Sequence, residues 1–208
     1  MLNRTLRPAP AGPGAAERRL WLAALGAAAL ALLLPQRAGA QDTVSVESAE
    51  LEVRDDPEPG LYLSAQFAFE PSPAIEDAVR RGIPVYFAID FELVRRRWYW
   101  FNRLVVSATL GYRLTYSPLT RQFRLSRGAL AQPFDTLDEA LATVRTVRDW
   151  KVAGREAAAS REHLLARIRL RLDKTMLPKP FQVDSLTNPD WALASDWKPV
   201  AIGPISQR

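Results

Sequence analysis

The sequence predicts a mainly β protein, an antiparallel β-sandwich of immunoglobulin-like or related type with about seven strands and two short helices. Apolar and polar residues alternate along several segments, as they do in half-buried strands. Turn-forming residues separate these segments, and the chain has no cysteine, so its fold depends on a hydrophobic core rather than on disulfides. A half-open β-barrel is the alternative, because alternation does not show whether a sheet closes on itself.

The first two strands are expected at residues 43–53 and 61–69, with the turn sequence DDPEPG between them. The apolar residues change parity between Val46 and Leu51, which predicts a slip inside the first strand. A short helix is expected at residues 71–82, opened by prolines and ended by a glycine.

Three further strands are expected at residues 83–94, 104–116 and 122–127. Strict alternation in the first of them places its apolar residues on one face and the others on the opposite face. The core face holds Val85, Phe87, Ile89, Phe91 and Leu93, and the opposite face holds Tyr86, Ala88, Asp90 and Glu92.

A second helix is expected at residues 136–150, where Thr136 and Glu139 form a capping box. A strand follows at residues 164–173, and prolines in LPKPFQ predict an extended segment after it. The helix has an apolar stripe, and the strand alternates apolar residues with arginines that are expected to face water or acidic neighbours. The stripe is Leu137, Ala140, Leu141, Val144 and Val147; the strand alternates Ile168, Leu170 and Leu172 with Arg167, Arg169 and Arg171.

The first forty residues have the pattern of a secretory signal peptide. Four arginines precede the uncharged run of residues 20–34, and Ala38 and Ala40 supply the small residues of a cleavage site. A run of about 15 residues is shorter than the roughly 20 that span a bilayer as a helix. We therefore expect cleavage after Ala40, a periplasmic location, and a single β-rich domain over residues 41–208 with no transmembrane segment. An uncleaved anchor is the alternative.

The charge balance argues against nucleic acid as a partner. The whole chain has 28 Lys and Arg residues against 23 Asp and Glu; the first forty residues contain five of the basic and one of the acidic ones, which leaves 23 and 22. Such a near-neutral chain lacks the basic footprint that nucleic-acid binding needs. No cofactor or metal is expected, since there is no cysteine and His163 is the only histidine. Its place before a strand indicates a solvated position rather than a catalytic base.

Two groups of carboxylates are candidates for chemistry. Asp90 and Glu92 lie on one strand face, where they are near enough for acid–base catalysis. Asp55, Asp56 and Glu58 offer oxygen ligands to calcium, which requires a shaped loop. The other interpretation is that the first pair is the solvent side of a half-buried strand and that the second group is a charged turn.

The segment RRRWYWFNR is predicted to be a hairpin tip and a candidate binding patch. The patch consists of Arg95, Arg96, Arg97, Trp98, Tyr99, Trp100 and Phe101. Because a strand alternates its faces, one pair of rings is expected in the core and the other only partly covered. Exposed rings beside arginines suit an envelope protein or the anionic membrane surface; complete burial in the core is the alternative. Trp191 and Trp197 either hold a sugar ring or fill the core.

Five segments resemble an uncharacterised family of exported proteobacterial proteins, catalogued as a domain of unknown function. They are WYWFNR, YRLTYSPLTRQFRLSRG, DEALATVRTVRDWKV, RLRLDKTMLPKPFQV and DWALASDW. The resemblance implies a signal-peptide-bearing envelope protein with a link to envelope sensing, and it brings no catalytic residues. We therefore expect a soluble periplasmic binding or interaction module. The alternative is a hydrolase that acts on an envelope polymer through carboxylates such as Asp90 and Glu92.

Overall fold

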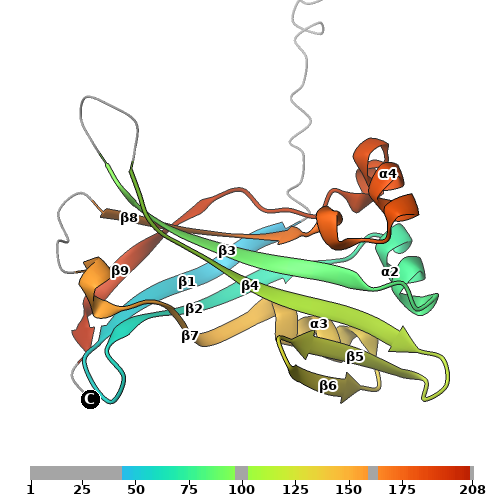
Figure 1. Ribbon diagram of the computed structural model, residues 1–208, viewed down its shortest axis with the longest axis horizontal. Helices are drawn as coiled ribbons and strands as arrows, with labels where there is room; N and C mark the ends of the chain where they lie inside the picture. Colours follow the sequence, from blue (N-terminus) through green and yellow to red (C-terminus); the bar gives the residue numbers. More distant parts are fainter. Residues whose placement is uncertain (1–43, 97–102, 159–163, 207–208) are drawn as a thin grey trace, which may run out of the picture. The chain divides into compact units, whose positions relative to one another are not determined.

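The computed structural model describes residues 44–96, 103–158 and 164–206, which form a mainly β protein (Figure 1). Their strands join in one nine-stranded sheet that forms a half-barrel, in the order β6-β5-β4-β3-β8-β9-β1-β2-β7. Neighbouring strands are antiparallel except β9 and β1, which are parallel, so the sheet is mixed. The mainly β class is confirmed. The predicted antiparallel sandwich is wrong, and the half-open barrel is the shape observed.

The bounds of the elements are as follows. The strands are β1 (Val44–Arg54), β2 (Gly60–Phe69), β3 (Val85–Arg95), β4 (Arg103–Ser117), β5 (Gln122–Arg127), β6 (Leu130–Phe134), β7 (Thr146–Ala153), β8 (Leu164–Leu172) and β9 (Lys198–Ser206). The helices are α2 (Pro73–Arg80), α3 (Leu137–Arg145) and α4 (Lys179–Thr187), and three 3-10 turns are η1 (Arg155–Ala158), η2 (Lys174–Met176) and η3 (Pro189–Trp191).

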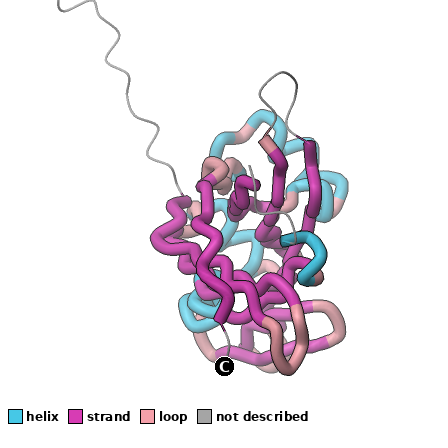
Figure 2. Tube along the Cα trace, turned by 90° about the vertical axis from the view of Figure 1, so that its left-hand side faces the viewer, coloured by secondary structure: helices cyan, strands magenta, loops and turns pink. Residues whose placement is uncertain are grey.

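Strand β9 explains why two groups of strands form one sheet. Its first residues pair antiparallel with β8, as Val200 does with Ala166. Its later residues pair parallel with β1, as Ala201 does with Glu50. The strands on either side of β9 thus belong to one continuous hydrogen-bonded sheet, although they face each other across the interior. Figure 2 shows strands on both sides of that interior.

The predicted strands of the first hairpin are confirmed. In β1, the register with β2 shifts between Val46 and Ser48, which is the predicted parity slip. In β3, the predicted core face is confirmed, because Phe87, Ile89 and Phe91 are at most 1% exposed. On the opposite face, however, Ala88 and Asp90 are also buried. Strand β8 alternates as expected, with its apolar residues buried and its arginines half-buried.

Helix α2 begins at the cap residue Ser72, whose side chain accepts a hydrogen bond from the Ile75 amide. The capping box of α3 is confirmed, because Thr136 and Glu139 each accept a hydrogen bond from the other's backbone at 3.2 Å. However, α3 ends at Arg145, and the prediction of helix to residue 150 is wrong. The following residues pair with the edge of β2 and form β7 instead.

Three further segments also differ from expectation. The segment LPKPFQ, predicted to be extended, contributes to helix α4, because prolines are tolerated in the first turn of a helix. Strands β6 and β9 were not predicted; each contains proline, which weakens the strand pattern.

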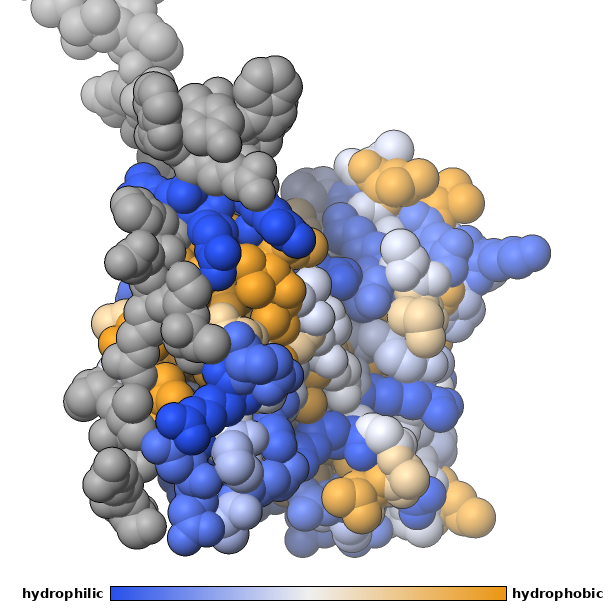
Figure 3. Space-filling view, turned by 60° about the vertical axis from the view of Figure 1, so that its left-hand side comes forward, coloured by the Kyte–Doolittle hydropathy of each residue, from blue (hydrophilic) through white to orange (hydrophobic). Residues whose placement is uncertain are grey.

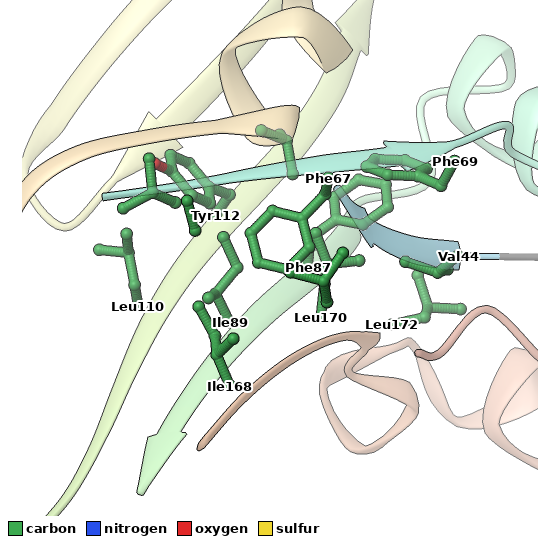
Figure 4. Close-up of a cluster of buried hydrophobic side chains, with 14 of the residues drawn as sticks. Val44, Phe67, Phe69, Phe87, Ile89, Leu110, Tyr112, Ile168, Leu170 and Leu172 are labelled. Atoms are coloured by element: carbon green, nitrogen blue, oxygen red, sulfur yellow. The ribbon is translucent and has the colours of Figure 1, made fainter. Parts of the chain in front are cut away.

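The core lies inside the half-barrel, between its facing strands. The rings of Phe69 in β2 and Phe87 in β3 are 5.7 Å apart between centroids, and Phe67, Ile89 and Leu170 lie around them (Figure 4). Each fully buried Phe or Leu side chain contributes roughly 1.5–3 kcal/mol of transfer free energy. Helix α3 contacts β5 and β6 on one side and β2 and β7 on the other, so it covers the open side of the sheet.

Candidate binding surface on the outer strands

One part of the sheet carries positive charge alone. Between Arg103 and Phe134, which spans β4 to β6, the sequence contains five arginines and no Asp or Glu. All five arginines are exposed. We call this set the basic flank: Arg103, Arg113, Arg121, Arg124 and Arg127. Since the chain beyond the first forty residues is nearly neutral, the positive charge of the flank is matched by an acidic excess elsewhere in it.

The arginines of the basic flank differ from those of other strands in their ion pairing. Within the described parts of the chain, none of the five forms a salt bridge, whereas Arg145, Arg167 and Arg169 do. An arginine that is not neutralised by a neighbour contributes fully to the potential outside the protein. The basic flank therefore attracts anions.

Large apolar side chains stand exposed beside these arginines. Leu119, in the turn before β5, is 94% exposed, and Leu130, which begins β6, is 69% exposed. They lie at opposite ends of β5, which at about 3.4 Å per residue is about 20 Å long. On the face of the molecule that Figure 3 shows, hydrophobic residues occur in separate groups among hydrophilic ones. Exposed leucines among arginines match the composition of surfaces that touch lipid headgroups.

A slot opens on the outer face of β3, β4 and β5, next to the basic flank. Ala88 and Gly111 are directly opposite each other in the register of β3 and β4. A Cβ atom added at Gly111 would meet nothing within 4 Å. The rows of Tyr86 and Asp90 on either side are four residues apart, about 13 Å along the strand. Because Ala88 and Gly111 fill little of the space between these rows, a cavity of about 400 Å³ is left there.

One wall of the slot is a row of polar donors. Tyr86, Arg113 and Ser126 are cross-strand neighbours in β3, β4 and β5. As far as the structure describes the chain, no hydrogen bond or ion pair engages any of these three side chains. Asp173 lies beside Tyr86 in this row, because its amide donates to the Tyr86 carbonyl oxygen, and its carboxylate is bonded to Arg171 and Thr175. Met176, which is 55% exposed, also lines the slot. The slot thus combines an available guanidinium and two hydroxyls with an apolar side chain.

The predicted carboxylates lie in a ladder of ion pairs on the same outer face. Asp90 accepts hydrogen bonds from Thr109 Oγ1 at 2.9 Å, Arg169 Nε at 3.0 Å and Arg171 Nε at 2.8 Å. Glu92 accepts one from Arg167 Nε at 2.8 Å. These arginines face acidic neighbours, as expected.

This ladder disfavours the use of Asp90 as a catalytic acid. Burial raises the pKa of Asp90, but the hydrogen bonds from Arg171, Thr109 and Arg169 outweigh it, so that the pKa lies below its ordinary value. The carboxylate remains ionised at neutral pH and has no proton to donate. Asp90 and Glu92, whose spacing indicated acid–base chemistry, are therefore part of a structural network of ion pairs.

The two C-terminal tryptophans have different surroundings. Trp191 is 2% exposed, and its Nε1 donates to Asp184 Oδ2 at 2.8 Å. Trp197 is half-buried and lies over the guanidinium groups of Arg167 and Arg169, at 4.6 and 4.5 Å from the ring centroid. Because Trp191 is buried, it offers no open platform for a sugar ring; Trp197 covers the ion-pair ladder.

Most of the predicted aromatic patch falls outside the described residues. Arg95 is half-buried at the end of β3, and Arg96 is exposed. Arg97 and the four rings Trp98, Tyr99, Trp100 and Phe101 are outside the described ranges, as is His163, so their roles stay predictions.

The acidic turn after β1 is occupied by ion pairs. Asp55 pairs with Arg155, and Glu58 pairs with Lys151. Across residues 44–96, 103–158 and 164–206, no cluster of three or more His, Asp or Glu side chains is arranged to hold a metal ion. Over the same ranges, no helix has both the length and the apolar character needed to cross a bilayer.

The described residues form a mainly β half-barrel. On one flank of it, β4 to β6, the charged side chains are all arginines. The chain belongs to the family Domain of unknown function (DUF4390), whose family model matches residues 41–201. This confirms the resemblance of the five sequence segments to a domain of unknown function. No match was found among curated proteins, and none among solved structures.

Two features of this surface were missed by reasoning from the sequence. The acid-free run from Arg103 to Phe134 is visible in the sequence, but the net charge of the chain conceals it. The slot depends on Ala88 and Gly111 being opposite each other, and that register is set only when β3 and β4 pair.

Proposed function

We propose that the protein is an exported, periplasmic binding module of the cell envelope that docks on the anionic membrane surface through its basic flank. The observation that carries the proposal is the run of exposed, unpaired arginines without any acidic residue on β4 to β6. The export signal expected in residues 1–40 supports the location.

A membrane surface fits the flank better than an acidic protein. Specific protein interfaces are complementary, with charges placed against particular opposite charges. Here the charge has a single sign, and exposed leucines interrupt it at Leu119 and Leu130. Anionic headgroups attract such charge, at about 1 kcal/mol for each Lys or Arg near the surface, and leucines reach the acyl boundary.

The test is binding of the purified protein to vesicles of phosphatidylglycerol mixed with phosphatidylcholine. Replacing Arg121 and Arg124 with glutamine should remove about 2 kcal/mol of attraction and lower the partition coefficient about thirtyfold. A matched control, Arg148→Gln with Lys179→Gln, removes the same charge from exposed residues of β7 and α4. It should reduce binding much less.

Salt provides a second measurement. Raising the ionic strength should weaken the vesicle binding of the unsubstituted protein, because counterions screen exposed charges. Equal binding to vesicles of phosphatidylcholine alone, or equal losses in the two double variants, would contradict docking through the basic flank.

The hydrolase alternative gains no support from this geometry. It required Asp90 and Glu92 to act on a substrate, and both carboxylates are bonded to arginines.

A further inference from the structure

We infer that the slot between β3, β4 and β5 binds a phosphate ester, with Arg113 as its principal anion contact. The inference deepens the proposed function, because it assigns a headgroup site to the membrane-docking surface. It rests on the proposed function for the source of the ligand. The shared chemistry is a phosphate oxygen anion with a short organic stem, which a lipid headgroup or a soluble phosphoester can supply.

The shape of the slot follows from residues that lack side chains. Ala88 and Gly111 form its floor, and Gly128 adds a third small residue at its border. Gly128 has a φ of 58°, so the turn after β5 favours glycine there. Gly111 has no such constraint, since its backbone lies outside the left-handed region. The cavity of about 400 Å³ is within the range of small-molecule sites.

The chemistry follows from the donors on the wall. The Arg113 guanidinium presents several N–H donors in a plane that suits phosphate oxygens. Arg113 lies between Tyr86 and Ser126 in the register of β3, β4 and β5, and all three residues line the slot. Both hydroxyls are able to donate to an anion, and nothing in the described chain engages them.

The surroundings select for an anion with an organic stem. Asp173 pairs with Arg171 at 3.4 Å, and within the described residues it forms no ion pair with Arg113. The amide of Asp173 donates to the Tyr86 carbonyl oxygen at 2.7 Å, which fixes η2 beside the slot. Met176 on η2 then offers an adaptable apolar contact to a carbon stem.

The experiment measures glycerol phosphate binding by titration calorimetry on the purified protein and three variants. Gly111→Leu fills the slot without changing charge, Arg113→Gln removes the anion contact, and Arg124→Gln removes the same charge from the flank outside the slot. We expect Gly111→Leu to melt within a few degrees of the unsubstituted protein, because its new side chain enters open space.

Loss of glycerol phosphate affinity by tenfold or more in both slot variants, with less than a threefold change in Arg124→Gln, supports the inference. Failure of the unsubstituted protein to bind glycerol phosphate, or equal binding by all variants, overturns it.

Vesicle binding identifies the source of the phosphate and separates the two proposals. A lipid source predicts that Gly111→Leu also weakens binding to phosphatidylglycerol vesicles, although the flank charges remain. If only glycerol phosphate binding is lost, the slot takes a soluble phosphoester, which supports the site and rejects the lipid source. If vesicle binding fails in every form but glycerol phosphate binds, the docking proposal fails and the slot stands.

Discussion

Replacing Asp90 with asparagine tests whether the ion-pair ladder stabilises the outer face of the sheet. The Asp90 carboxylate is 7% exposed and accepts hydrogen bonds from Thr109, Arg169 and Arg171. Asparagine has nearly the same shape but no charge, so it leaves Arg169 without its counterion and Arg171 with Asp173 alone.

The structure sets the size of the expected loss. Removing one partner of a buried ion pair costs about 3–5 kcal/mol. The side chains of Arg169 and Arg171 are 36% and 29% exposed, so water screens part of the interaction. We expect the free energy of unfolding of Asp90→Asn to fall by about 2–3 kcal/mol, and the melting temperature by about 5–10 °C for a chain of this size.

The effect should depend on pH in one direction. The folded pKa of Asp90 is lowered, whereas the unfolded value is about 3.9. Such a carboxyl group stabilises the folded state above the unfolded pKa, and this contribution is lost as the pH falls through the folded pKa. Asparagine does not titrate. The difference in unfolding free energy between the two proteins should therefore be largest near neutral pH and shrink below about pH 4.

Urea unfolding at pH 7 and at pH 3 measures both quantities. Glu50→Gln is the matched control, because Glu50 is an exposed carboxylate on β1, and its loss should stay within about 0.5 kcal/mol. A similarly small loss for Asp90→Asn at pH 7, or a difference from the unsubstituted protein that does not change with pH, would refute the reasoning.

Two further outcomes are expected. Leu170→Ala should lower the free energy of unfolding by about 3 kcal/mol, because Leu170 is fully buried; Leu119→Ala, at a 94% exposed site, should change it by less than about 0.5 kcal/mol. Equal losses in urea unfolding would contradict the assigned core. For export, the intact mass of the protein from the periplasmic fraction should correspond to a chain that begins at Gln41, and a mass that includes residues 20–34 would contradict cleavage.

The parts of the fold that the sequence predicts are those in which the local pattern and the tertiary environment agree. Alternation in β3 and β8 identified the face of each strand that packs in the core. The capping box of Thr136 and Glu139 was predicted because its two side chains satisfy backbone amides at the start of the same helix. These signals depend on neighbours in the chain, so the sequence contains them directly.

The missed parts depend on distant partners. Residues after Arg145 continue a helical pattern, but Thr146 and Val147 are β-branched and pair with the open edge of β2. The parallel pairing of β9 with β1 joins Ala201 to Glu50, and no local pattern indicates it. The candidate site divides in the same way. The composition of the basic flank can be read from the sequence, whereas the slot at Gly111 forms only when distant strands pair.

Strand β9 also has a consequence for how the sheet is assembled. Among the described strands it comes last in the chain, yet Lys198 at its start donates to the carbonyl oxygen of Val46, 152 residues earlier. Contacts of such separation close late, because loop-closure entropy opposes them until local hairpins have formed. Until β9 docks, β1 and β8 each present an unpaired edge, and each edge is a template for pairing with another copy of the chain. Docking of β9 thus removes both of these edges at once and leaves β6 and β7 as the two edges of the described sheet.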